Sequence, residues 1–157
     1  MSDTPDDRPN RLPLPPMIYV GSLLGAWLLA EYAPIPIDLP RELLRIKGAV
    51  MIGLGLMLMV WSSSTLSRAG TTVLPNRAST ALVTTGPFGF SRNPIYIGNT
   101  LVLAGFGGIA GSPWYWLAAA IALLLVDRLA VRPEEQHLAA RFPAEWAAYA
   151  ARVRRWL

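Results

Sequence analysis

A glycine- and proline-rich stretch, LVTTGPFGFSRNPIYIG at residues 82–98, carries residue types that could hold a small charged ligand. Its glycines permit backbone conformations that are closed to other residues, so a ligand can approach the main chain there. Pro94 suits the first turn of a helix, which leaves Asn93 as the expected N-cap with Arg92 beside it. Such a helix start, with free N–H groups at the positive end of the dipole, could receive a carboxylate.

The first turns of the same helix carry Tyr96 and Gly98. A tyrosine ring and the gap left by a glycine could receive a flat ring such as adenine. A turn followed by an ordinary capped helix explains the same spacing equally well.

Two adjacent acids, Glu134 and Glu135, form the second group that could do chemistry. Pro133 before them is expected to kink or restart a helix, which places both acids in a first turn where the dipole favours them. Adjacent side chains on a helix diverge by about 100°, so one acid could face the interior and the other a basic neighbour. A buried carboxylate here could bind an ammonium group or hydroxyls. Solvated acids at a helix start are the simpler interpretation, and His137 is read as a polar-face residue.

Apolar helices must position these groups, because the chain is too poor in charge for an ordinary soluble domain. Hydrophobic residues make up 53% and charged residues 15%, against roughly 25% charged in an average soluble domain. The predicted fold is all-α, a polytopic membrane helix bundle with about four spans, at residues 17–34, 46–66, 94–110 and 114–131. No charge occurs from Asn93 to Val126. One helix of that length would be about 50 Å long, beyond a hydrocarbon core of about 30 Å, so a turn is expected at Gly111-Ser112-Pro113.

The remaining segments are assigned from their patterns of charge and hydrophobicity. Residues 1–16, rich in Asp and Pro, are expected to form a disordered tail, and residues 17–157 a single domain. Aromatic and aliphatic residues recur every three or four positions through residues 133–156, which predicts an amphipathic helix lying on the membrane surface. Pro143 is expected to break this helix into two pieces. Eleven of the 14 basic residues fall on the side that holds both termini. The excess of basic residues on the inner side of membranes predicts that both termini are cytoplasmic.

Composition also restricts the classes of function. Cysteine is absent and His137 is the single histidine, so no disulfide framework, thiolate nucleophile or metal site is expected. The net charge of +4 comes almost wholly from arginine. Attraction to the anionic headgroups of membrane lipids explains this charge more simply than nucleic-acid binding does.

The two stretches together resemble a known superfamily, that of the phospholipid and isoprenylcysteine carboxyl methyltransferases, above all its small bacterial members. The similar residues are LVTTGPF at 82–88, SRNPIYIG at 91–98, the acid pair, and aromatic and basic residues up to Arg154-Arg155-Trp156. The resemblance spans roughly Gly70 to Leu157 and implies a helical membrane enzyme that binds S-adenosylmethionine between the two stretches. The residues it implies around the cofactor are Gly86, Pro87, Arg92, Asn93, Pro94, Tyr96, Gly98, Glu134 and Glu135.

One position departs from the superfamily pattern. Many members have histidine where this chain has Asn93, and asparagine can cap and hydrogen-bond but cannot act as a titrating base near pH 7. Glu134 is then the candidate catalytic residue, which would receive a proton from an amine acceptor, whereas a carboxylate acceptor would need no base. The expected reaction is methyl transfer to a lipid-like or hydrophobic acceptor at the cytoplasmic face of a bacterial inner membrane.

Two other functions stay open from the sequence. Membrane sterol reductases, which use NADPH, have a similar C-terminal architecture but are much longer. A small non-enzymatic membrane scaffold would explain the apolar segments but not why the glycine-rich stretch occurs together with the acid pair. The sequence leaves amine, carboxylate and thiol acceptors open, with protein prenylcysteine the least favoured, and it leaves the oligomeric state open.

Overall fold

The computed structural model describes residues 14–70 and 82–157, and within these residues the regular structure is entirely helical, as predicted. Residues 1–13 of the predicted tail lie outside the described residues, and residues 14–16 open the first helix. The elements are α1 (Leu14–Tyr32), α2 (Arg41–Arg68), the short 3-10 helix η2 (Gly86–Gly89), α3 (Pro94–Ala110), α4 (Trp114–Val126), the π-helical turn η3 (Asp127–Val131), α5 (Arg132–Arg141) and α6 (Pro143–Arg152).

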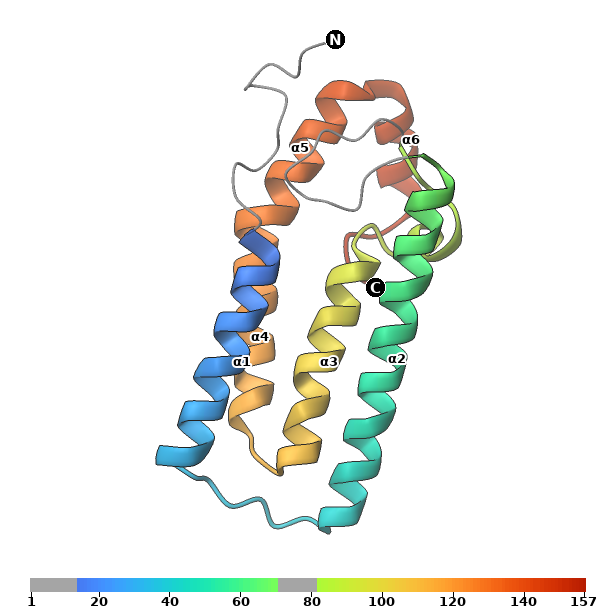
Figure 1. Cartoon of the computed structure of the whole chain (residues 1–157). Coiled ribbons are helices and arrows are strands. Elements are labelled where there is room, and N and C mark those ends of the chain that lie inside the picture. Colours follow the sequence, from blue (N-terminus) through green and yellow to red (C-terminus); the bar gives the residue numbers. More distant parts are fainter. Residues whose placement is uncertain (1–13, 71–81) are drawn as a thin grey trace.

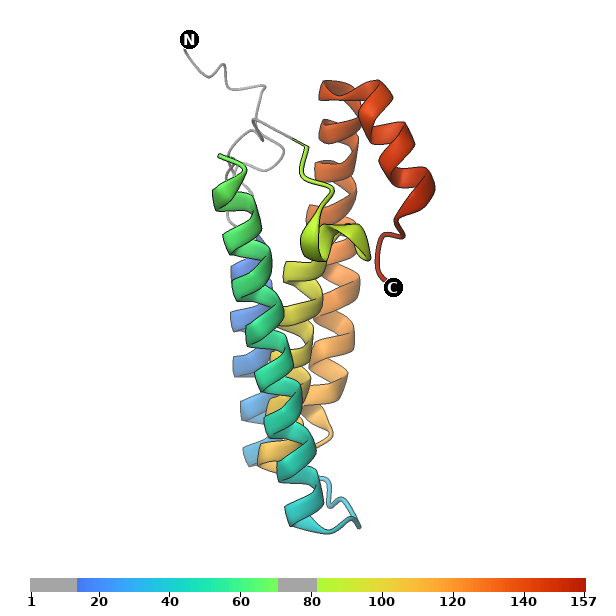
Figure 2. The same ribbon diagram turned by 90° about the vertical axis from the view of Figure 1, so that its right-hand side faces the viewer.

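Four long helices run side by side along one axis (Figures 1 and 2). Helix α2 packs against α3, α3 packs against α4, and α1 covers α4. The predicted turn between the third and fourth segments is confirmed, since Gly111 takes a left-handed conformation (φ 66°) after α3 and Pro113 precedes α4. The two halves of this hairpin therefore begin and end as the Pro and Gly signals indicated.

Glycines bring α2 and α3 into backbone contact. A Cβ atom placed on Gly105 would lie 2.7 Å from the carbonyl oxygen of Gly48, and one on Gly55 would lie 2.6 Å from that of Gly98. Only residues without side chains allow two helices to approach this closely, a packing mode common between membrane helices. The contact fixes α3, and with it the chain segment that leads into α3, against α2.

We expect Gly105→Ala to lower the apparent melting temperature in detergent, because its new methyl group would force the two backbones apart. Overpacking of this kind costs about 1–3 kcal/mol. Gly53→Ala is the matched control, since a Cβ atom there meets nothing within 4 Å. Equal melting temperatures for the two variants, measured by fluorescence, would show that the close contact is not formed.

At Pro133, where a kink or a restart of the helix is predicted, the helix does not restart. The chain stays helical from Trp114 to Arg141, and the π-helical turn η3 lies directly before the proline (Figure 1). Proline lacks an N–H and its ring presses on the preceding turn, and the wider π turn accommodates both effects. The predicted break at Pro143 is confirmed, since α5 ends at Arg141 and α6 begins at Pro143 and folds back (Figure 2). The segment 133–156 therefore holds two helices, the first of which continues α4.

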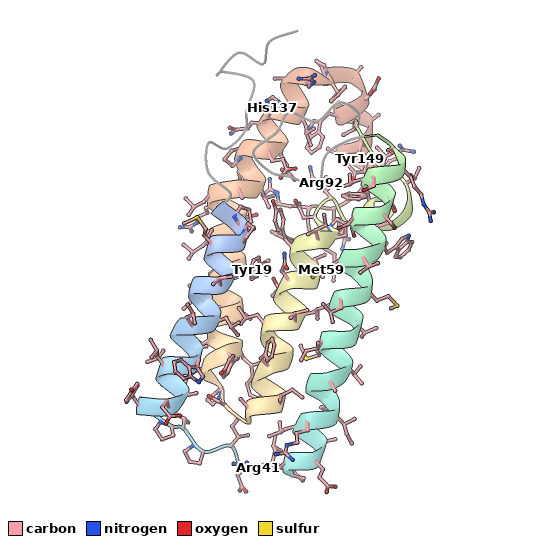
Figure 3. All side chains as sticks on the ribbon, viewed as in Figure 1. Tyr19, Arg41, Met59, Arg92, His137 and Tyr149 are labelled. Carbon is pink, nitrogen blue, oxygen red and sulfur yellow. The ribbon has the colours of Figure 1, made fainter. Side chains whose placement is uncertain are left out.

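Two of the described helices are long and apolar enough to cross a membrane: α2, and the continuous helix Trp114–Arg141. Helix α3 is apolar but shorter. Large apolar side chains project outward from α2, among them Val50, Leu54, Met57 and Val60 (Figure 3). Helices α1 and α3 remain predicted spans, and their observed bounds differ by at most three residues from the predicted ones.

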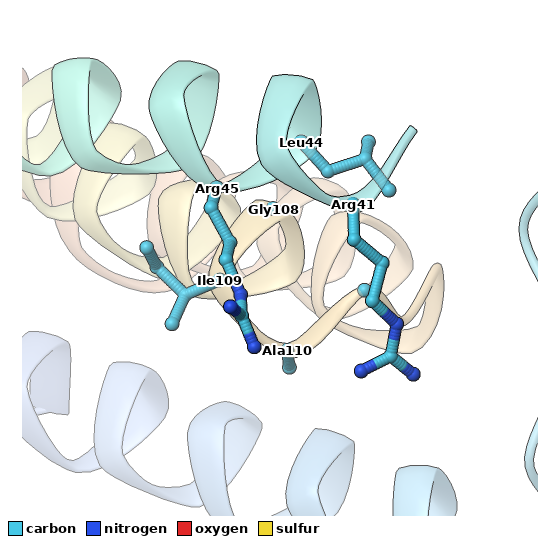
Figure 4. A pocket seen from close by; sticks show the side chains of 7 residues that line it. Arg41, Leu44, Arg45, Gly108, Ile109 and Ala110 are labelled. Carbon is cyan, nitrogen blue, oxygen red and sulfur yellow. The ribbon is translucent and has the colours of Figure 1, made fainter. Parts of the chain in front are cut away.

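The two ends of the bundle carry different chain segments (Figure 3). The stretch that leads into α3 lies at the same end as α5 and α6, whereas Arg41 marks the other end. A small hollow at the Arg41 end is lined by Arg41, Leu44, Arg45 and residues 108–111 (Figure 4). The groups that could do chemistry thus share one end, far from this hollow.

Candidate active site

The glycine-rich stretch is held between α2 and α6. Gly86 (φ 60°) opens η2 and faces Thr65 and Trp61 of α2, not the acid pair. Phe88 is buried, and its carbonyl oxygen accepts a 2.8 Å hydrogen bond from the hydroxyl of Tyr149 on α6. Burial raises the pKa of Tyr149 to about 12, so its hydroxyl remains a hydrogen-bond donor at neutral pH. Tyr149 therefore bonds the glycine-rich stretch to α6.

The turn Ser91–Asn93 is bonded to the C-terminal segment that follows α6. The Arg92 N–H donates to the carbonyl oxygen of Arg154 at 3.0 Å. The Ser91 hydroxyl and the Asn93 amide both donate to the carbonyl oxygen of Arg155, at 3.2 and 3.1 Å. Asn93 stands at the N-cap position of α3, as predicted, but its side chain makes no cap bond. Its amide N–H donates to the C-terminal segment instead.

Glu135 lies between two arginines. Its Oε2 accepts hydrogen bonds from Nε (3.0 Å) and Nη2 (2.7 Å) of Arg155, while its Oε1 lies 3.3 Å from Nη1 of Arg92. Arg155 also reaches Asp127 at 3.6 Å, and Asp127 pairs with Arg132 at 2.8 Å. These alternating charges join the turn before α3, the π turn, α5 and the C-terminal segment into one network.

Glu134 points to a different neighbour, as the predicted divergence of adjacent acids requires. The Tyr96 hydroxyl donates to its Oε2 at 3.4 Å, and no cation pairs with it among the described residues. Glu134 lies beyond the apolar stretch of its helix, which ends at Val131. Removal from water raises the pKa of Glu134 from 4.5 to about 7; the Tyr96 hydrogen bond opposes the rise and the charge of Glu135 adds to it.

The raised pKa of Glu134 predicts a pH-dependent stability. The folded protein holds a proton that the unfolded chain has already lost, so the associated stability is complete below pH 4.5 and lost as pH rises through about 7. Glu134→Gln, which mimics the protonated acid, should raise the melting temperature at pH 8 but not at pH 4.5. The expected gain is roughly 2–3 kcal/mol. Glu145→Gln, which changes an exposed acid on α6, is the control. A melting temperature of Glu134→Gln that differs from wild type by the same amount at pH 8 and at pH 4.5 would contradict the assignment.

Arg92 is the second basic group beside Glu135, 3.3 Å from its Oε1, whereas Arg155 lies closer. The guanidinium carbon of Arg92 lies 5.5 Å from the ring centre of Trp146, a cation–π contact, and the Arg92 side chain is only 15% exposed. Its Nε is buried and has no hydrogen-bond partner among the described residues. Buried polar groups are normally satisfied, so an unused arginine donor beside an acid pair is consistent with a site for an acidic ligand group.

The gap expected beside Gly98 is filled. A Cβ atom there would lie 2.6 Å from Met59 Cγ and 2.8 Å from the carbonyl oxygen of Gly55, so α2 occupies the space proposed for adenine. Gly98 packs α3 on α2, and a direct contact with a cofactor stays a prediction for this residue.

Five of the nine predicted cofactor residues are brought together at one place: Arg92, Asn93, Tyr96, Glu134 and Glu135. Gly86 and Gly98 face α2, and Pro87 and Pro94 are buried at the starts of η2 and α3. Sequence reasoning gave no site role to Asp127 and Trp146. It named Ser91 and Arg155 only among the residues that carry the resemblance, and it allowed that Tyr149 could reach inward. Asp127 carried a signal, since it is the first charge after the long uncharged interval. Among the described residues, no three His, Asp or Glu side chains are grouped so that they could hold a metal ion.

Two curated proteins are similar to this chain over 80 residues at 35% identity. They are the cobalt-zinc-cadmium resistance protein CzcN of Cupriavidus metallidurans and the nickel-cobalt-cadmium resistance protein NccN of Alcaligenes xylosoxydans xylosoxydans. The similar segment is 51% of this chain but only 37% of each relative, so the chain covers well under half the length of these proteins.

A family comparison covers more of the chain. The phospholipid methyltransferase family matches residues 43–145, a range that contains the glycine-rich stretch, α3 and the acid pair. The match extends over more than half of the chain and agrees with the resemblance seen in the sequence. The chain therefore belongs to the phospholipid methyltransferase family.

Proposed function

We propose that the protein is a membrane enzyme that transfers a methyl group from S-adenosylmethionine to a lipid-like or hydrophobic acceptor. The observation that carries the proposal is that Arg92 contacts Glu135 while the adjacent Glu134 bonds to Tyr96, at one end of the bundle. Arg92 presents an unused buried donor, and Glu134 presents a carboxylate without a cation among the described residues. A zwitterionic ligand requires both.

The residues present fit S-adenosylmethionine, which carries a carboxylate, an ammonium, a sulfonium and ribose hydroxyls. Arg92 would hold the carboxylate through its free Nε and its outer nitrogens, as guanidinium forks do. Glu134 would accept hydrogen bonds from the ammonium or the ribose, with Tyr96 orienting its Oε2 at 3.4 Å. When bound, the cofactor supplies an electrophilic methyl carbon for in-line displacement. The protein's own contribution is to orient the reactants and exclude water.

Glu134 is the proposed proton acceptor for an amine acceptor. A carboxyl group with a pKa of about 7 is half ionised at neutral pH, where a general base is most effective. The proton would move from the acceptor nitrogen to a carboxylate oxygen of Glu134. A carboxylate acceptor would leave this proton step unused, so the effect of Glu134→Gln on transfer separates the two acceptor classes.

We place the reaction at the cytoplasmic side of a bacterial inner membrane. A lipid-like acceptor can enter sideways from the bilayer, and the charged cofactor can enter from water at the same end. The basic residues support this orientation, since most of them lie on the chain segments at the site end, where anionic headgroups attract them.

The direct test is transfer of labelled methyl from S-adenosylmethionine into a total membrane extract by the purified protein, with the product identified by mass. We expect a labelled lipid-like product with the wild type, and at least tenfold less with Arg92→Ala. Label that enters no membrane component, at any protein concentration, would contradict the proposal.

The names of the relatives suggest a cellular setting for the same reaction. Those proteins are named for resistance to cobalt, zinc, cadmium and nickel. We propose that methylation of a membrane component could serve such tolerance. The test compares the growth of a host strain that carries Arg92→Ala with the growth of the wild-type strain on cadmium or cobalt. Equal growth of the two strains would contradict this setting.

A further inference from the structure

The C-terminal segment is bonded to the turn before α3 at three points. The backbone carbonyl oxygen of Arg154 accepts a hydrogen bond from the Arg92 N–H. The carbonyl oxygen of Arg155 accepts hydrogen bonds from the Ser91 hydroxyl and the Asn93 side-chain amide. Ser91 is fully buried and Asn93 is 8% exposed. The Ser91 hydroxyl also accepts from the Asn93 N–H at 3.1 Å, so the turn itself is held rigid. The three bonds to the C-terminal segment, of which the two side-chain bonds are partly buried, join residues more than 60 positions apart.

The bonds determine where the Arg155 guanidinium lies. With its carbonyl oxygen fixed by two donors, Arg155 directs Nε and Nη2 to the Oε2 of Glu135 and Nη1 to Asp127. The contact with Glu135 in turn raises the pKa of Arg155. Arg155 thereby makes the two shorter contacts with Glu135. Arg92 is left with one longer contact of 3.3 Å to Oε1, and its Nε stays unused.

We propose that Arg155 is a positioning residue of the site. It is held in place by the lock, which is the set of three hydrogen bonds from Ser91, Arg92 and Asn93 to the C-terminal segment, and position 93 serves as one of the donors. This inference rests on the proposed binding of S-adenosylmethionine. Arg155 takes both hydrogen bonds at Oε2 of Glu135, so Arg92 makes a single 3.3 Å contact with Oε1 and keeps its Nε free for the cofactor carboxylate. Glu134 then takes the cationic part of the cofactor. Without the lock, Arg92 pairs more fully with Glu135, and its Nε is no longer free.

The lock requires a hydrogen-bond donor at position 93, and this donor need not be an ionisable base. Asparagine supplies its amide N–H to a carbonyl oxygen. Histidine can supply a ring N–H from a similar place, whereas aspartate would put an anionic oxygen against the Arg155 carbonyl oxygen and repel it. The matched variants are therefore Asn93→His, which keeps a donor, and Asn93→Asp, which removes it at nearly equal volume. Ser91→Ala removes one bond with little change in volume, and Arg152→Ala, an exposed arginine of the same region, is the control.

Hydrogen exchange of the Arg92 amide and of α6 reports the lock without any cofactor, because the Arg92 N–H is itself bonded to Arg154. We expect exchange at least tenfold faster in Asn93→Asp, a smaller increase in Ser91→Ala, and wild-type rates in Asn93→His and Arg152→Ala. Calorimetry in detergent should then give an S-adenosylmethionine Kd at least tenfold weaker for Asn93→Asp and for Arg155→Ala. Asn93→His should stay within threefold of wild type, and kcat at saturating cofactor should change less than KM in every variant.

Two results would overturn the inference. One is wild-type exchange and affinity in both Asn93→Asp and Ser91→Ala. The other is faster exchange with unchanged affinity, which would make the C-terminal segment merely structural. A wild-type protein that binds no S-adenosylmethionine contradicts the proposed function instead, and the exchange rates still decide whether the lock exists.

Discussion

Arg92→Ala is expected to weaken the binding of S-adenosylmethionine by about 10- to 100-fold and to reduce methyl transfer at least as strongly. A hydrogen bond to a charged group contributes roughly 1.5–3 kcal/mol, and Arg92 would make at least one with the cofactor carboxylate. The loss is specific, because Arg155 still neutralises Glu135 in the variant. Calorimetry on the detergent-purified protein measures the change in Kd directly.

Matched variants separate this role from general charge effects. Arg92→Lys keeps the charge but loses the planar fork, so an intermediate affinity is expected. Arg128→Ala removes an exposed arginine near the same end of the bundle and should leave the Kd unchanged. The assignment of Arg92 fails if Arg92→Ala binds as tightly as Arg128→Ala, with both proteins shown to be folded by their melting curves.

The two adjacent acids are expected to respond in opposite ways to the same substitution. Glu135→Gln removes the carboxylate shared by two arginines and should lower the melting temperature by several degrees. Breaking a buried ion pair costs up to about 3–5 kcal/mol, and Glu135 is 11% exposed. Glu134→Gln should instead leave the fold intact at neutral pH and lower methyl transfer to an amine acceptor by at least tenfold.

Thermal melting and transfer assays on both variants test this division. The two acids occupy successive positions, so both substitutions make the same chemical change one residue apart. A Glu135→Gln protein as stable as wild type would show that the arginine pairs contribute little. Full transfer by Glu134→Gln to an amine acceptor would remove Glu134 as the base and favour an acceptor that needs none.

The hairpin of α3 and α4 could be predicted closely from local signals. Pro94 begins α3, Gly111 ends it, and Trp114 begins α4, each where the sequence indicated. These signals act within one turn of the chain, through the fixed φ of proline and the left-handed conformation open to glycine. The association of the glycine-rich stretch with the acid pair was predicted from the resemblance, since no local pattern links segments some 40 residues apart.

The parts that could not be predicted depend on contacts distant in sequence. Asn93 stands at the N-cap position of α3, as its local preference indicates, but its side chain makes no cap bond. The local rule does not show that its amide N–H donates to the carbonyl oxygen of Arg155, 62 positions away. Arg155 itself entered only as a basic residue near the C-terminus. Pro133 looked like a helix break because the local rule does not foresee a π turn directly before it. In each case tertiary structure overrides a preference of about 1–3 kcal/mol.

Gly98 illustrates the same limit at the site. A glycine in a helix start can leave a gap for a ligand or for another helix, and the sequence does not distinguish them. Here the gap is taken by Met59 and the backbone of α2. A reader of the sequence could have noted that glycines recur on both α2 and α3, which favours helix packing over ligand binding.

Calorimetric titration of the wild-type protein and of an Arg92→Ala/Glu134→Gln double variant with S-adenosylmethionine tests the central claim most directly, with NADPH titrated in parallel. The account predicts one bound S-adenosylmethionine per wild-type chain, no measurable binding by the double variant, and no binding of NADPH. Equal affinity of both proteins for S-adenosylmethionine, or a wild-type chain that binds NADPH in its place, would contradict it.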